Sequence, residues 1–203
     1  MTSIEHLTLE VADLAAAQRF YADALGLEKQ VRLRESQAPT SGFRGWTVSL
    51  VVSRPSIVEG LVGAALRAGG TELKPAGKSF WGFGGVVQAP DGTICKVASS
   101  SKRDSGPDTR EIDQAVLLLG VSKMAASKRF YRERGLTVAR SFGSRYVEFE
   151  AGSSPVKLAL YGRRGLARDA GVAPEGEGSH RLAIGADAGG FTDPDGFVWE
   201  AAA

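Results

Sequence analysis

Residues 9–27 read Leu-Glu-Val-Ala-Asp-Leu-Ala-Ala-Ala-Gln-Arg-Phe-Tyr-Ala-Asp-Ala-Leu-Gly-Leu, and residues 119–136 read Leu-Gly-Val-Ser-Lys-Met-Ala-Ala-Ser-Lys-Arg-Phe-Tyr-Arg-Glu-Arg-Gly-Leu. The second stretch repeats the Val and the Arg-Phe-Tyr of the first at the same spacing. A second match follows, with Ala-Pro-Asp-Gly at residues 89–92 and Asp-Pro-Asp-Gly at residues 193–196. Each half of the chain therefore opens with a strand that runs into a helix and closes on a Pro-Asp-Gly hairpin. This pattern indicates an internal duplication.

The duplication divides a chain of 203 residues into two units of small-domain size. Residues 99–110 are polar and show no periodicity, which is typical of a linker. We therefore expect an N-terminal domain at 1–98, a linker at 99–110 and a C-terminal domain at 111–203.

The composition argues against several classes of protein. The net charge is +2 and no long basic run is present, which argues against nucleic acid as a partner. No apolar stretch approaches the ~18 residues that a membrane span needs. Cys95 is the single cysteine, so no intrachain disulfide can form, and its place in an alternating strand favours packing. The first residues do not resemble a signal peptide. These features predict a cytoplasmic protein.

The sequence predicts three helices, and the first two have recognisable ends. Asp13 caps a helix that ends at Gly26, Pro55 begins a second that ends at Gly69, and a third covers 123–133. Strands are expected at 5–11, 28–34, 46–53, 71–74, 83–88, 93–98, 114–121, 137–141, 145–150, 155–161, 180–186 and 197–202. Residues 35–45 and 162–179 are expected to be loops.

This order of strand, helix and three strands resembles the vicinal oxygen chelate superfamily, which includes glyoxalase I, bleomycin-resistance proteins and extradiol dioxygenases. The resemblance rests on Val-x-Asp-Leu, Phe-Tyr and Leu-Gly at the start of the unit and Asp-Pro-Asp-Gly-x-x-Trp-Glu at its end. Matching stretches are 6–27, 42–98, 116–136 and 178–200. It implies an α+β fold of tandem βαβββ modules, whose curled mixed sheets form cups around a ligand.

The first and last modules are truncated relative to the family, and this leaves two pairings open. Sequential pairing would give two incomplete cups. Alternatively, the two complete central modules form one cup, while the first and last fragments complement each other.

The resemblance also implies positions for a divalent metal, held by His, Glu or Gln on the first and last strands of each module. Three residues match these positions: His6, His180 and Glu200. The central modules carry other residue types at them: Trp46, Lys96, Val116 and Leu158. If the termini pair, the three matching residues could form a two-His-one-carboxylate site for Fe, Mn, Ni or Zn. Because the central positions lack ligands, we expect no cofactor, with one divalent metal as the alternative.

Aromatic side chains in the central modules suggest an organic ligand instead. Trp46 replaces a family ligand, so the resemblance points its indole into the cup, where it could stack on a planar molecule. Lys96 could then contact an acidic or phenolic group. The candidate ligand-binding residues are Trp46, Phe80, Trp81, Phe83, Lys96, Tyr146 and Tyr161.

The sequence thus predicts a metal-free protein that binds a small apolar or aromatic molecule. One alternative is a metal-dependent lyase, isomerase or dioxygenase that uses His6, His180 and Glu200. Another is a degenerate structural module whose cups are filled by side chains. Exposed sheet edges in an incomplete cup would favour a homodimer that covers them.

Overall fold

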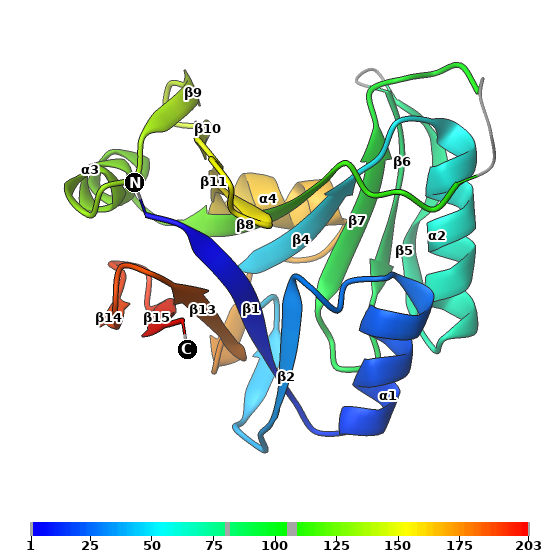
Figure 1. Ribbon diagram of the computed structural model, residues 1–203, viewed down its shortest axis with the longest axis horizontal. Coiled ribbons are helices and arrows are strands. Elements are labelled where there is room, and N and C mark those ends of the chain that lie inside the picture. The colour runs from blue at the N-terminus through cyan, green and yellow to red at the C-terminus, as the bar shows by residue number, and fades with distance from the viewer. Residues whose placement is uncertain (1, 80–81, 105–108, 203) are drawn as a thin grey trace.

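The computed structural model describes residues 2–79, 82–104 and 109–202 and has the predicted α+β fold, in which strands dominate (Figure 1). The helical elements are α1 (Leu14–Gln18), the π-helical turn η1 (Arg19–Ala24), α2 (Pro55–Arg67), α3 (Met124–Glu133) and α4 (Arg163–Ala170). The strands are β1 (Ile4–Val11), β2 (Val31–Glu35), β3 (Thr40–Gly42), β4 (Trp46–Val51), β5 (Thr71–Ser79), β6 (Gly82–Gln88), β7 (Ile94–Ser99), β8 (Gln114–Val121), β9 (Val138–Phe142), β10 (Tyr146–Phe149), β11 (Val156–Gly162), β12 (Gly176–Gly178), β13 (Leu182–Ala186), β14 (Phe191–Thr192) and β15 (Val198–Ala201). Within the described ranges, no helix is long and apolar enough to cross a membrane.

The two central modules join into one eight-stranded sheet. Its strand order is β5-β6-β7-β4-β8-β11-β10-β9, so each module contributes four neighbouring strands. The modules meet where β4 and β8 run antiparallel, from Trp46 opposite Leu119 to Val51 opposite Gln114. Helix α2 packs against β6 and β7, and α3 packs against β11. Residues of both helices belong to the main hydrophobic core, so one face of this sheet is turned toward that core.

The chain termini form a second sheet, of five strands in the order β14-β15-β13-β1-β2. Strands β1 and β13 pair antiparallel, with Leu7 opposite Ile184 and Leu9 opposite Leu182. Figure 1 shows this pairing in the lower part of the molecule, where β13 lies beside the N-terminal strand. Of the two pairings that the sequence allows, the structure therefore has the one in which the first and last fragments complement each other. Both sheets combine strands from 1–98 with strands from 111–203.

Residues 162–179, predicted to be a loop, contain helix α4 and strand β12, and that prediction was wrong. The helix forms because Leu166, Ala167 and Ala170 lie on one side and are buried there. Strand β12 pairs antiparallel with β3, which lies within the other predicted loop, at 35–45. Gly176 permits this close approach, since a Cβ there would lie 2.2 Å from the Phe43 carbonyl oxygen.

A tyrosine hydroxyl docks each Phe-Tyr helix onto a Pro-Asp-Gly turn. On η1, Tyr21 donates to Asp91 Oδ1 at 2.6 Å, and on α3, Tyr131 donates to Asp193 Oδ2 at 2.6 Å. Both tyrosines are buried, and burial followed by the nearby aspartate raises the pKa of each phenol. Asp195, the repeat counterpart of Asp91, instead accepts the backbone N–H that precedes α3. Each hydroxyl thus ties a helix of one module to a turn of another.

Removing either hydroxyl should destabilise the fold. Tyr131→Phe and Tyr21→Phe should each lower the free energy of unfolding by about 1–3 kcal/mol, because a buried carboxylate oxygen loses its donor. Chemical denaturation measures the change. Tyr161→Phe is the control, since the Tyr161 hydroxyl has no hydrogen bond among the described residues and should cost far less. Equal losses for the three variants would contradict the docking role.

Candidate functional site

The eight-stranded sheet has two faces of different character. One, the core face, carries α2 and α3 and the main hydrophobic core. The opposite one, the α4 face, is covered in part by α4, which packs against β4, β8 and β11. There Leu166, Ala167 and Ala170 of α4 form a small apolar cluster with Phe43 and Ile94. The face opposite the module helices thus holds a helix of the chain itself.

A row of side chains crosses the middle of the α4 face on four adjacent strands. In order from β7 through β4 and β8 to β11, it consists of Lys96, Ser49, Val116 and Lys157. Successive side chains of a strand point to opposite faces. The neighbours Cys95, Val97 and Leu158 belong to the main core, which places the row on the other side. Two ammonium groups therefore lie at the floor of this face.

A pocket of about 470 Å³ remains on the α4 face beside the C-terminal end of α4. It is bounded by β5, β6 and β7, and its lining includes Lys74, Lys78, Phe83, Val86, Lys96 and Asp169. Lys96 Nζ lies 2.7 Å from Asp169 Oδ2. Lys74 Nζ donates to the Arg168 and Asp169 carbonyl oxygens, at 2.9 and 2.6 Å, and so holds the last turn of α4. The pocket therefore combines an apolar wall with charged groups at one end.

Lys157, the other lysine of the row, forms an ion pair within the sheet. Lys157 Nζ lies 3.2 Å from Glu148 Oε1, and the Tyr146 hydroxyl donates to Glu148 Oε2 at 2.8 Å. Burial raises the pKa of Glu148, but the hydrogen bonds from Tyr146 and Lys157 outweigh it and hold the pKa below its ordinary value. The Tyr146 ring meets the Tyr161 ring edge-on, with centroids 5.9 Å apart. All three polar groups come from β10 and β11, so this cluster is part of the sheet.

The structure distributes the predicted ligand-binding residues over both faces. Those on the α4 face are Lys96, Tyr146 and Tyr161. Trp46 lies in the main core instead, and its indole Nε1 donates to the His180 carbonyl oxygen at 2.8 Å. Phe83 also packs in the main core, although it lines the pocket as well. Phe80 and Trp81 lie outside the described residues.

Two of the three predicted metal ligands share one face of the five-stranded sheet. His6 lies opposite Gly185 of β13, and Gly185 lies opposite Glu200 of β15. The His6 ring covers Gly185, where a Cβ would lie 2.3 Å from His6 Cε1. Arg34 reaches across the same face and binds both Glu200 oxygens, at 2.9 and 2.6 Å. His6 and Glu200 are thus brought together, but an arginine already occupies the carboxylate.

The third predicted ligand, His180, lies away from this pair. It precedes β13, whereas His6 lies opposite Gly185 near the other end of that strand. Its Nδ1 is 2.6 Å from the Arg44 carbonyl oxygen, and its Nε2 is 3.2 Å from the Asp195 carbonyl oxygen. The imidazole stacks on Phe197, with ring centroids 4.2 Å apart. Both ring nitrogens therefore face backbone carbonyl oxygens, and the N–H of a neutral ring can donate to one of them.

These contacts do not suit a divalent metal. Such an ion needs free nitrogen and oxygen donors that converge. In the described part of the chain, no group of three or more His, Cys, Asp or Glu side chains could hold one. The central row presents lysines, whose charge repels a cation. The donor set of this chain thus departs from that implied by the resemblance.

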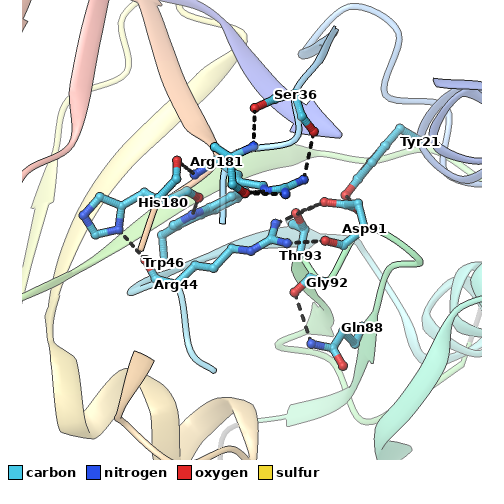
Figure 2. Close-up of polar contacts among 12 residues, drawn as sticks. Tyr21, Ser36, Arg44, Trp46, Gln88, Asp91, Gly92, Thr93, His180 and Arg181 are labelled. Carbon is cyan, nitrogen blue, oxygen red and sulfur yellow. Dashed lines mark hydrogen bonds and ion pairs between the residues drawn. The ribbon is translucent and has the colours of Figure 1, made fainter. Parts of the chain in front are cut away.

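A buried ion pair links the elements around His180 (Figure 2). Arg44 Nη1 lies 3.4 Å from Asp91 Oδ2, and their side chains are only 9% and 5% exposed. Thr93 and Tyr21 also donate to the Asp91 carboxylate. Burial lowers the pKa of Arg44, although the nearby Asp91 opposes this shift. Arg44 also lines a second cavity of about 370 Å³, where its guanidinium is already committed to Asp91.

Sequence reasoning missed several residues that shape the α4-face pocket. Asp169 lies in the segment 162–179, which the sequence predicts to be a loop, and the spacing of Leu166, Ala167 and Ala170 is the signal for its helix. Lys157, which lies in the same row as Lys96 but outside the pocket, does not emerge from the sequence either, because the family position matches its neighbour Leu158. The alternation along β11, which buries Leu158, could have corrected this.

Comparisons with known proteins agree on the fold. No family model matches the sequence, and no curated protein matches it. Among solved structures, glyoxalase I from Zea mays is similar with a TM-score of 0.64 and 15% identity, over 98% of this chain and 91% of that chain. A putative dioxygenase from Bacillus subtilis is similar with a TM-score of 0.55 and 14% identity, over 90% of this chain and 69% of that chain. The chain has the fold of the vicinal oxygen chelate superfamily.

The Arg34–Glu200 contact predicts a measurable titration. The hydrogen bond from Arg34, together with the charges of Arg34 and His6, holds the pKa of Glu200 below its ordinary value. Stability from this pair is therefore present above the pKa of an unfolded Glu and is lost as the pH falls through the folded pKa. Arg34→Met should raise the Glu200 pKa, as measured by carbon NMR of the carboxyl group. Arg32→Met is the control. No change on Arg34→Met would contradict the contact.

Proposed function

We propose that this protein binds a small apolar or aromatic molecule in the pocket on the α4 face. The observation that carries the proposal is the pocket itself, which lies on the face opposite the module helices and is closed at one end by the Lys96–Asp169 pair. Small-molecule sites usually measure about 300–1,000 Å³. A volume of about 470 Å³ falls within this range.

The chemistry of the lining favours an organic ligand. Val86 and Ala98 supply apolar surface on the α4 face, and Lys96 supplies a donor beside them. This combination is typical of sites that bury a ring or hydrocarbon and orient it through a few polar groups. The apolar wall accounts for affinity and the ammonium group for orientation.

The metal-dependent alternative would need His6, His180 and Glu200 to converge. Their geometry favours it less, because Arg34 binds both Glu200 oxygens and His180 lies away from His6 and Glu200, with a backbone carbonyl oxygen beside each ring nitrogen. The filled-module alternative has one observation in its favour, which is the apolar packing of α4 on the sheet. That packing covers only part of the face, and the pocket lies beside it.

We also propose that the protein forms a homodimer and is located in the cytoplasm. The edge strands β5 and β9 of the larger sheet, and β2 and β14 of the smaller one, offer backbone groups at which a second copy could pair. With Cys95 as its single cysteine, the chain forms no intrachain disulfide, so its fold does not depend on an oxidising compartment.

A library of small neutral and acidic aromatics, screened by NMR on the labelled protein, tests this proposal. We expect binders that shift the resonances of β6 and β7, and Lys96→Met should weaken them by about tenfold, equivalent to 1.4 kcal/mol. Lys157→Met is the matched control, because Lys157 lies in the same row and is also ion-paired. It should change affinity by less than about twofold.

Three results would contradict the proposal. Absence of any binder would favour the filled module. Equal effects of the two lysine substitutions would place the ligand elsewhere. Retention of about one Mn, Ni, Zn or Fe ion per chain, lost on His6→Ala and on Glu200→Gln, would favour the metal-dependent alternative.

A further inference from the structure

Asp169 is placed unusually for a carboxylate. It lies in the last turn of α4, where the partial negative charge of the helix C-terminus disfavours an acidic side chain. Its side chain reaches the sheet and lies 2.7 Å from Lys96 Nζ. The Lys96 ammonium therefore offsets the unfavourable interaction between the Asp169 carboxylate and the helix C-terminus. If another anion binds Lys96, the Asp169 side chain loses this stabilisation and can turn away from the sheet.

The Lys96–Asp169 ion pair is exposed enough for a ligand to replace Asp169. The side chains of Lys96 and Asp169 are 32% and 43% exposed, and both line the pocket. By contrast, Lys157 and Glu148 are 26% and 17% exposed. Glu148 also accepts from Tyr146, and all three come from adjacent strands. Of these two lysines in the row, Lys96 is therefore the one whose partner a ligand can replace.

The charge of the pocket favours an anion. Lys74, Lys78 and Lys96 line it, and Asp169 is the acidic residue among its lining side chains. Lys74 also binds the backbone carbonyls of Arg168 and Asp169, so α4 remains held by its main chain when the Asp169 side chain turns away. Exchange at Lys96 thus needs a side-chain rotation, and the helix can stay in place.

We propose that Asp169 is an internal stand-in for the acidic group of the ligand, and that the pocket takes an aromatic carboxylate, which displaces Asp169 from Lys96. This inference rests on the proposed function and specifies its ligand class. The ring packs on the apolar wall formed by Val86 and Ala98, which share the α4 face with Lys96. The ligand carboxylate accepts the hydrogen bond that Lys96 gives to Asp169 in the ligand-free protein.

Titration calorimetry with benzoate and its neutral isostere benzamide tests this inference. Asp169→Asn keeps the shape of the side chain and removes the competing charge, so benzoate should bind about tenfold tighter to this variant than to the unaltered protein. Benzamide should bind both proteins within about twofold. Glu148→Gln is the matched control, because it removes the other carboxylate that pairs with a lysine of the row, and it should leave benzoate binding unchanged.

The outcomes separate this inference from the proposed function. Unchanged or weaker benzoate binding by Asp169→Asn, or no benzoate binding by that variant, would overturn the stand-in role. Benzamide binding without benzoate binding would overturn the anion preference while supporting a ligand pocket. Equal gains for Asp169→Asn and Glu148→Gln would reduce the effect to overall charge and would also overturn the inference.

Discussion

The antiparallel pairing of β1 with β13 is the contact on which the rest of the architecture depends. It joins the first fragment of the chain to the last, so the two complete modules between them are left to pair with each other through β4 and β8. Gly185 helps to fix the register of this pairing. It lies opposite His6, and a Cβ at this position would collide with the imidazole ring. Leu7 and Leu9 on β1 also direct this sheet toward the main core. A one-residue slip would turn these side chains away from it.

This pairing decides which groups can act together. It gathers Lys96 and Lys157 into one row on the α4 face, and it leaves His180 at a junction where backbone carbonyls engage its ring. The chain carries the vicinal oxygen chelate fold with ammonium groups and an arginine–glutamate pair near the positions that the resemblance assigns to metal ligands. Helix α4 then shapes the remaining space and contributes Asp169 to it. The α4 face of the larger sheet thus combines ammonium groups with a helix of the chain itself.

Much of this architecture follows from the sequence because local patterns encode it. The repeated Phe-Tyr segments and Pro-Asp-Gly turns located the modules, and alternation located most strands. The sequence left the pairing of modules open, because both pairings bury the same apolar faces and differ only in long-range partners. Helix α4 was missed because its short apolar stripe, centred on Leu166, is hidden among charged residues. The resemblance points Trp46 into the cup, whereas alternation with Val48 and Leu50 places it on the core side of β4, where the structure has it.

The pairing of the termini is the central claim, and an engineered cross-link tests it most directly. Thr8 of β1 lies opposite Ala183 of β13. Cα atoms of such partners are about 4.5–5.5 Å apart, within the range that a disulfide spans. Thr8→Cys combined with Ala183→Cys should form an intramolecular disulfide in the folded, oxidised protein, detected by mass spectrometry, whereas neither single variant should. Free thiols at both positions in the folded double variant would contradict the pairing and the arrangement of the site built on it.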